Sequence, residues 1–157
     1  MKKFFLVLAI ALMTIPTFAQ DDTYTRGKGF FARPDIYGGF FANVGYQINP
    51  YFQVSVGPGL LFIINNTGTD IDLSGMVHGG IRAYTSTNKW TGLIDYHAGI
   101  LQYQGYQVWR HSLVGGASYK DLDFGGGLQV MFGPNGQIIG YGPLITAGWN
   151  FRFYKHN

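Results

Sequence analysis

The sequence predicts an all-β fold, a single eight-stranded antiparallel up-and-down β-barrel of the transmembrane type that follows a cleaved signal peptide. The C-terminal pattern, the N-terminal leader and the composition predict it. From Ile145 to Phe153 apolar residues occupy every second position, with mostly small or polar ones between them. Because a strand sends successive side chains to opposite faces, one face here is apolar and aromatic and the other mostly polar. That pattern is typical of an outer-membrane strand with lipid on one side and a lumen on the other.

The N-terminus has the features of a secretory signal peptide. Two lysines precede an apolar run from Phe4 to Ile15, and the exit Thr17–Ala19 suits cleavage before Gln20. The run is too short to cross a bilayer as a helix, which takes roughly 20 apolar residues. The chain contains no cysteine, so no disulfide framework is expected. We therefore divide it into a signal peptide, residues 1–19, and one barrel domain, residues 20–157.

The composition favours strands and excludes several classes of protein. Charged residues make up 12% of the chain, aromatic residues 17%, and there are 24 glycines. A soluble domain usually has about 25% charged residues, and glycine disfavours helices. Removal of Lys2 and Lys3 with the leader lowers the formal charge from +3 to +1, so nucleic acid is not an expected partner. No later stretch is long and apolar enough for a membrane helix.

The first two strands are expected at Tyr24 to Arg33 and Ile36 to Ile48. Alternation in the first is poor, and we expect Pro34–Asp35 to end it. Alternation in the second is regular, with apolar residues on one face. Asn49–Pro50 predicts a tight turn, because proline fixes φ and pushes the preceding residue out of the helical region.

The third and fourth strands are expected at Tyr51 to Ile64 and Leu73 to Tyr84. In the third, apolar residues alternate with glutamine, serine and glycine. Pro58 cannot donate to a ladder, so a local bulge is expected there. The polar stretch Asn65 to Asp72 is expected to form the loop between the two strands.

Turn residues delimit the next two strands, at Trp90 to Tyr103 and Arg110 to Tyr119. Ser86–Lys89 is expected as the turn before the fifth strand. Gln104 to Val108 is expected as a short aromatic and polar loop after it.

The seventh and eighth strands are expected at Leu122 to Phe132 and Tyr141 to Tyr154. Lys120–Asp121 makes the preceding turn, and Gly133–Gly136 opens the last loop. Most of the eight strands have the roughly 9 to 11 residues that a tilted membrane strand needs, and an even number suits a closed bacterial barrel. Links after strands two, four and six are expected to be tight and those after three, five and seven longer, which suits a periplasmic N-terminus.

Aromatic residues near the strand ends are expected to form two interfacial girdles. The periplasmic girdle would contain Tyr51, Phe52, Tyr84, Trp90, Tyr119, Phe153 and Tyr154. The opposite girdle would contain Phe62, Tyr103, Tyr106, Trp109, Phe132 and Tyr141.

Alternation also assigns the two faces of the wall. The lipid-facing residues are predicted to include Val54, Val56, Ile81, Ile94, Ala98, Ile145, Ala147, Trp149 and Phe151. The polar lumen cluster is predicted to contain His78, Arg82, Asp95, His97, Gln129, Asn150 and Arg152. An eight-stranded barrel is only wide enough for side chains to fill it, so we expect a hydrogen-bonded plug in which Arg82 and Asp95 pair across strands. The alternative is a narrow pore or a small polar pocket.

Histidines and a carboxylate in the lumen cluster, and a histidine–serine pair outside it, are the candidates for metal binding and catalysis. His78, His97 and one carboxylate could hold a metal between neighbouring strands, but they lack a loop motif, so no metal and no cofactor are expected. His111 and Ser112 are the only adjacent histidine–serine pair, and neighbours on a strand point to opposite faces. No catalytic site is therefore expected, and the chain is not expected to be an enzyme.

Two other functions remain open from the residues. Asn65–Asp70 and Gln104–Trp109 could form a loop surface for binding or adhesion, with Trp109 and Tyr106 packing on a ligand whose identity is undetermined. A soluble periplasmic carrier of a small apolar ligand, built like a lipocalin, would have the reversed alternation, with the apolar face inward. The few charges on the polar face favour lipid on the outside.

One segment resembles a known family. Gly45-Tyr46-Gln47-Ile48-Asn49-Pro50-Tyr51-Phe52 resembles a strand-turn-strand motif of small OmpA-like outer-membrane β-barrel domains, and Gly80–Tyr84 resembles the strand that follows it. The aromatic last strand is similar to the signal by which the outer-membrane assembly machinery recognises such proteins. The resemblance implies the barrel fold, a location in the outer membrane of a Gram-negative bacterium, and outer-membrane lipid and the assembly machinery as partners.

Overall fold

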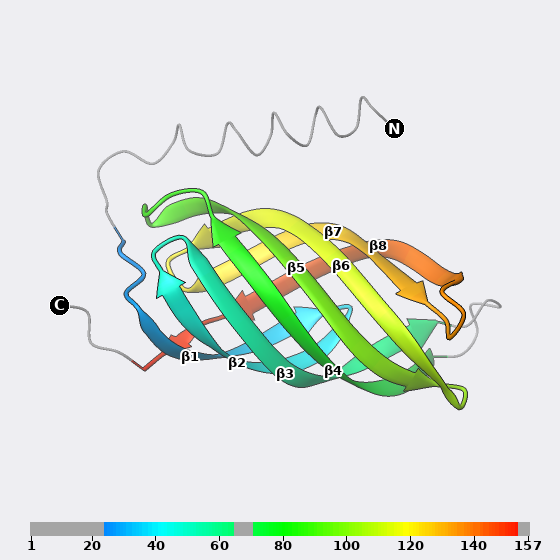
Figure 1. The fold of residues 1–157 in the computed structure, drawn as a ribbon. Helices are drawn as coiled ribbons and strands as arrows, with labels where there is room; N and C mark the ends of the chain where they lie inside the picture. Colours follow the sequence, from blue (N-terminus) through cyan, green and yellow to red (C-terminus); the bar gives the residue numbers. More distant parts are fainter. Residues whose placement is uncertain (1–23, 65–70, 154–157) are drawn as a thin grey trace, which may run out of the picture.

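The computed structural model describes residues 24–64 and 71–153 of the 157-residue chain. The predicted signal peptide, Asn65–Asp70 and Tyr154 lie outside the described residues. The described chain forms one barrel, with both of its ends at the same side (Figure 1). The strands in chain order are β1 (Gly29–Tyr37), β2 (Gly39–Asn49), β3 (Phe52–Ile64), β4 (Ile71–Tyr84), β5 (Trp90–Tyr103), β6 (Tyr106–Tyr119), β7 (Leu122–Phe132), β8 (Ile138–Trp149) and β9 (Phe151–Arg152).

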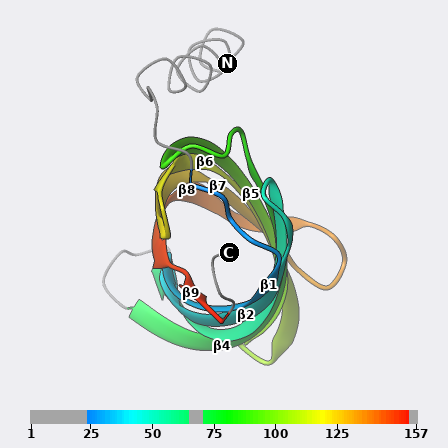
Figure 2. The ribbon, with the colours of Figure 1, turned by 90° about the vertical axis from the view of Figure 1, so that its left-hand side faces the viewer.

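The barrel is closed, as the sequence predicts. Each strand pairs antiparallel with the next along the chain, and β1 pairs with β2 on one side and with β8 and β9 on the other. Figure 2, viewed from the end where the described chain begins, shows the ring that results. β8 and β9 are one wall strand interrupted at Asn150, whose backbone N–H donates instead to the carbonyl of Asp121 at 2.9 Å. The chain is therefore an eight-stranded up-and-down barrel, and such closure leaves no sheet edge along the paired wall.

The first hairpin differs from the prediction. Pro34–Asp35 does not end a strand, because β1 continues through both residues to Tyr37. Pro34 lies opposite Ala42 of β2, but on its other side it falls between the short pairings to β9 and β8. The missing N–H of proline is therefore tolerated. The turn comes at Gly38 instead, whose φ of +69° suits glycine.

The prediction of a bulge at Pro58 was wrong. Pro58 pairs with Val77 of β4 in unbroken register, and the register between β2 and β3 is the same on both sides of it. The β2–β3 register shifts between Gln47 and Asn49 instead, beside the tight turn. Asn49 holds that turn, since its side-chain oxygen accepts the backbone N–H groups of Tyr51 at 2.8 Å and Phe52 at 2.9 Å.

The predicted alternation of link lengths was also wrong. The link after β5 is a two-residue turn, Gln104–Gly105, and not the loop expected over Gln104–Val108. Both turn residues have positive φ, at +50° and +81°, as in the type I′ turns that match strand twist. Residues that the sequence assigned to a loop, including Trp109, therefore belong to β6. The link after β4 runs from residue 85 to 89 and is among the longer ones.

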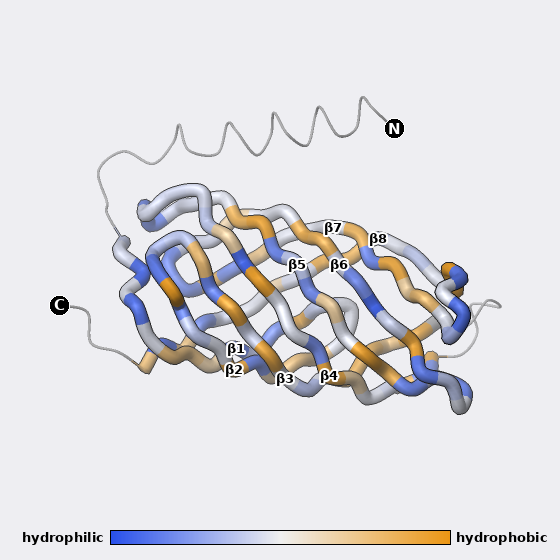
Figure 3. Tube along the Cα trace, in the orientation of Figure 1, coloured by the Kyte–Doolittle hydropathy of each residue, from blue (hydrophilic) through white to orange (hydrophobic). Residues whose placement is uncertain are grey.

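Apolar side chains point outward along the wall and polar ones point inward. Figure 3 shows hydrophobic and hydrophilic residues alternating along the strands. The interior changes character along the barrel axis. Most buried charged side chains lie in the half near the described N-terminus, where β1 begins, and the other half is mostly apolar, with Arg110 as its buried charge. The buried apolar cluster consists of Tyr37, Phe41, Leu61, Ile63, Met76, Leu101, Val108, Val114 and Leu144.

Three inward-facing glycines lie beneath rings of a neighbouring strand. A Cβ on Gly45 would come within 2.4 Å of the ring of Phe31, one on Gly59 within 2.0 Å of Phe41, and one on Gly80 within 2.5 Å of His97. In a narrow barrel a side chain at these positions would compete with the ring for the same volume. These glycines allow large rings to fill the lumen.

We expect Gly80→Val to lower the free energy of unfolding by about 1–3 kcal/mol, because overpacking displaces the buried ring of His97. Gly75→Val, on the same strand but facing outward into open space, is the matched control and should change stability by less than about 0.5 kcal/mol. Urea unfolding of the refolded barrel in detergent micelles measures both. Equal losses at the two positions would contradict the packing argument.

Candidate functional site

The centre of the charged half is Arg82 on β4, which is buried. Its two terminal nitrogens pair with Asp95 on β5 and Asp123 on β7, so one guanidinium joins three strands. Asp95 lies directly opposite Arg82 in the β4–β5 register. Asp123 also accepts the amide of Asn150 at 2.8 Å. Each of these three buried charges therefore has at least one partner of opposite charge. A charge in a low-dielectric interior requires such a partner.

Two histidines extend this network toward the apolar half. His97 Nε2 lies 3.0 Å from Asp95 Oδ1, and its Nδ1 lies 2.9 Å from the Nδ1 of His78. The two rings stack with centroids 4.7 Å apart. Because a hydrogen bond joins the two Nδ1 atoms, one of them carries the proton. Within residues 24–64 and 71–153, no group of three histidine, cysteine, aspartate or glutamate side chains is arranged to hold a metal ion.

A second buried charge pair lies on β1 and is joined to β2 by a neutral amide. Arg33 donates through Nε to Asp35 at 2.6 Å, and the side-chain amide of Asn43 donates to the same oxygen at 2.6 Å. At the adjoining end of the barrel Arg152 pairs with Asp121 and donates to Gln47 at 3.1 Å. The half of the lumen near the described N-terminus is therefore filled by polar side chains that pair with one another.

The segment that precedes β1, residues 24–28, crosses the mouth at this end, as Figure 2 shows. The N–H of Tyr24 donates to the carbonyl of Thr87 at 2.8 Å, and its hydroxyl donates to Asp121 at 2.6 Å. Arg26 is buried, donates to Ser118 and Lys120, and lies 4.1 Å from the ring centre of Tyr84. This arrangement favours a plug over a conducting pore.

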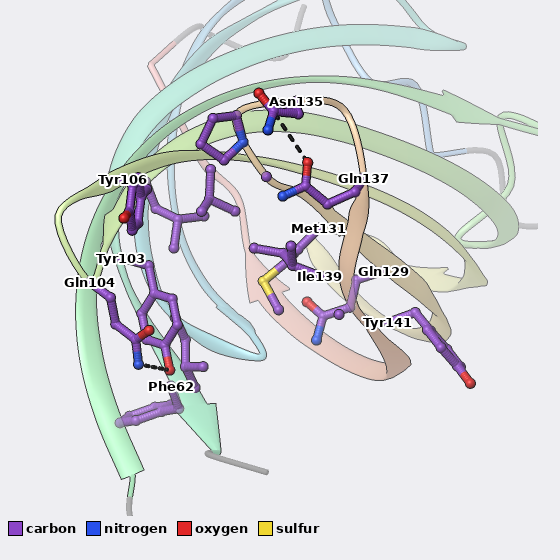
Figure 4. A pocket seen from close by; sticks show the side chains of 16 residues that line it. Phe62, Tyr103, Gln104, Tyr106, Gln129, Met131, Asn135, Gln137, Ile139 and Tyr141 are labelled. Carbon is purple, nitrogen blue, oxygen red and sulfur yellow. Dashed lines mark hydrogen bonds between the residues drawn. The ribbon is translucent and has the colours of Figure 1, made fainter.

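The opposite end of the barrel holds a cavity of about 940 Å³, which we call the rim cavity. Its apolar lining comes from Phe62, Ile63, Leu101, Val108, Met131 and Ile139, and its polar lining is mostly at the rim. In Figure 4 Tyr103 and Gln104 form one wall, Met131 and Ile139 stand on the facing wall, and Tyr141 points away. Its volume lies at the upper end of the range of small-molecule pockets, about 300–1,000 Å³.

The predicted lumen residues lie inside the barrel or at its ends, and the predicted lipid-facing residues lie on its outside. His78, Arg82, Asp95, His97 and Asn150 are buried inside the barrel, Arg152 joins them at its end, and Gln129 lies at the floor of the rim cavity. The predicted lipid-facing side chains Val54, Val56, Ile81, Ile94, Ala98, Ile145, Ala147, Trp149 and Phe151 all lie on the outer face.

The girdle assignment was wrong for three residues. Tyr103 and Tyr106 lie on the inner faces of β5 and β6 and line the rim cavity. Tyr84 is not at the outer surface, because its side chain is buried in the lumen and its hydroxyl donates to Gln53 at 3.1 Å. Its position follows from the alternation of β4, in which Tyr84 shares the face of Arg82. Proximity to a strand end is therefore insufficient to assign an aromatic residue to a girdle.

Sequence reasoning missed several interior residues, namely Arg26, Arg33, Asp35, Arg110 and Asp123. Asp123 could have been found, because it alternates with Phe124 in the same way as the predicted Gln129 does with Val130. Arg33 and Asp35 were missed because a strand end was placed between them. Arg26 precedes the first strand and carries no periodic signal.

His111 and Ser112 lie on opposite faces of β6. The His111 ring is on the outer face, where its Nδ1 lies 2.7 Å from the hydroxyl of Tyr96, whereas Ser112 is buried inside. The two side chains therefore cannot cooperate as base and nucleophile.

Neither a protein-family model, nor a curated protein, nor a solved structure matches the chain. In the part of the chain that the structure describes, no helix has the length and apolar character needed to cross a membrane.

Proposed function

We propose that this chain is an integral outer-membrane β-barrel protein with a structural or surface role and a polar lumen filled by side chains. The distribution of charge carries the proposal. In the described strands, Asp72 is the only aspartate, glutamate, lysine or arginine with an exposed side chain, and it lies at the start of β4 near the rim. A soluble protein normally needs charged residues over about a quarter of its surface or more. An outer wall without charge suits hydrocarbon.

The sense of the alternation argues against the soluble carrier. A lipocalin-like barrel would place its apolar face around a cavity and its polar face in water. Here Val56, Ile81 and Ile145 are exposed, the last by 80%, while arginine and aspartate side chains fill half of the interior. Exposed apolar side chains continue around the ring on every strand from β1 to β8. Such a continuous belt is far larger than the apolar patches of soluble monomers.

Aromatic residues at one end support a defined position in the membrane. Trp90 packs against Tyr119 with ring centroids 4.8 Å apart and against Phe124 at 6.0 Å, all on the outer face. Tyr51 and Phe52 are exposed at the same end. Tryptophan and tyrosine favour the headgroup level, so this end would lie at one interface. With the N-terminus in the periplasm, the rim cavity would then face the cell exterior.

Cell fractionation tests the proposal. In a Gram-negative host the protein is expected in the outer-membrane fraction, to require detergent for extraction, and to migrate differently on a gel before and after boiling, because a closed barrel resists unfolding by detergent. A known soluble periplasmic protein expressed in parallel is the control. Recovery of the chain in the soluble periplasmic fraction would contradict the proposal and favour the carrier.

A further inference from the structure

The barrel wall has a notch above the short β1–β2 hairpin. β1 pairs with β8 only at Asp35–Tyr37, opposite Thr146–Gly148, and β2 pairs with β3 no further than Gly39 opposite Leu61. The part of β8 from residue 138 to 145 therefore has β7 on one side and, among the residues that the structure describes, no strand on the other. Pro143 lies in this stretch, as is usual for an edge strand. The notch separates β3 from β8 at the end that holds the rim cavity.

The rim cavity lies behind this notch. It is lined from both sides of the notch, by Phe62 and Ile63 on β3 and by Ile139 and Gly140 on β8. Gly142 faces inward, since it pairs with the inward-facing Gln129, and a Cβ built on it would meet no atom within 4 Å. The inner side of β8 is thus open where the notch meets the cavity.

A buried cation lies beneath the cavity floor. Arg110 on β6 has no carboxylate partner among the described residues. Its Nε donates to Gln129 Oε1 at 2.8 Å, one terminal nitrogen donates to the carbonyl of Tyr37 at 2.8 Å, and the other reaches only the sulfur of Met76 at 3.8 Å. Gly38 closes the floor beside these groups. The charge is therefore held by neutral acceptors alone, unlike that of Arg82.

This cation fixes the orientation of Gln129. Because Gln129 Oε1 accepts from Arg110, its amide nitrogen is directed elsewhere, and Gln129 lines the cavity. The floor thus presents a hydrogen-bond donor in a positive potential, at the base of apolar walls. A ligand that matches it has an anionic oxygen group at one end and a hydrocarbon chain along the rest.

We propose that the rim cavity binds a membrane-derived long-chain fatty acid, which enters through the notch between β3 and β8. The carboxylate accepts from the Gln129 amide and compensates the charge of Arg110. The hydrocarbon chain packs on Leu101, Val108 and Met131. A lipid source is favoured because the outer faces on both sides of the notch are apolar, with Leu60 and Ile145 exposed. The entry route rests on the proposed membrane location.

Titration of carboxyl-labelled palmitate into the barrel in lipid nanodiscs, followed by carbon-13 NMR, tests the site. Insertion is first verified for each variant by heat-modifiable gel mobility, so that a loss of binding by an inserted barrel contradicts this proposal and leaves the proposed function intact. The wild-type protein is expected to give a saturable signal at one equivalent, with a carboxyl that titrates at lower pH than free palmitate in the same nanodiscs. Hexadecanol is expected to compete at least tenfold more weakly.

Two pairs of variants separate the walls from the floor. Gly142→Phe should fill the cavity and weaken palmitate binding at least tenfold, whereas Gly75→Phe, facing outward into open space, should leave it unchanged. Arg110→Met should abolish the preference for palmitate over hexadecanol, and Gln129→Leu should reduce it if Arg110→Met does not fold. Non-saturable partitioning, or binding insensitive to Gly142→Phe, would overturn the proposal.

Discussion

Replacing Arg82 with methionine is expected to lower the free energy of unfolding by about 3–5 kcal/mol, because it removes the partner of two buried carboxylates at once. Asp95 and Asp123 both pair with this one guanidinium, and all three side chains are almost completely inaccessible to solvent. Without it the two aspartates repel each other in a low-dielectric interior, and at least one must bind a proton on folding. Methionine approximates the aliphatic part of arginine, so little of the loss comes from packing.

The triple variant Arg82→Met, Asp95→Asn, Asp123→Asn separates charge from packing. Since replacing a whole buried ion cluster by neutral groups is often tolerated, it is expected to recover most of the stability that the single variant loses. Arg152→Met is the second comparison, because its partner Asp121 is partly exposed, and a loss near 1 kcal/mol is expected. Urea midpoints in detergent micelles measure all three. A triple variant as unstable as the single one would show that shape, not charge, determines the role of Arg82.

The alternation of apolar and polar residues predicted those strands in which one face packs in the interior and the other lies on the outer surface. β7 was predicted at its observed bounds, and the faces of β4 and β5 were correct, because each second residue must suit either the packed interior or the outer surface. The prediction of the first hairpin was wrong because Pro34 was taken as the end of a strand. Whether proline is tolerated depends on which neighbours pair beside it, and the gap between β9 and β8 is a property of the closed ring.

In the candidate sites, too, contacts between neighbouring strands could be predicted, whereas contacts across the lumen could not. The pairing of Arg82 with Asp95 could be anticipated because both residues lie on the polar faces of consecutive strands, where cross-strand neighbours of opposite charge pair, although the link between these strands is longer than expected. The link to Asp123 joins strands that are not neighbours and requires knowledge of which side chains meet across the lumen. The rim cavity depends on the length of the β1–β2 hairpin relative to β3 and β8, and hence on a turn at Gly38 that the sequence pattern did not indicate.

Ala98→Arg is expected to reduce the free energy of folding into lipid bilayers by about 2–4 kcal/mol, which is the cost of arginine near the midplane on the lipid face of a barrel. Ala98 lies on the outer face near the middle of β5, opposite Gly79 and His111, so an arginine there points away from the packed lumen. Thr146→Arg would be an unsuitable comparison, because Thr146 is buried in the lumen and any large residue there would disrupt packing.

Gln102→Arg is the matched control for Ala98→Arg, since it is on the same strand and the same outer face but next to the turn Gln104–Gly105. At the interface an arginine side chain extends to water, so a cost of about 0–1 kcal/mol is expected. Urea-dependent folding into lipid vesicles, followed by heat-modifiable mobility, gives both values. In a soluble barrel both positions would face water and both substitutions would fall within about 0.5 kcal/mol of the wild-type protein. The difference between the two variants therefore reports on the depth of the apolar belt, because the strand, the face and the introduced arginine are the same and the distance from the midplane changes.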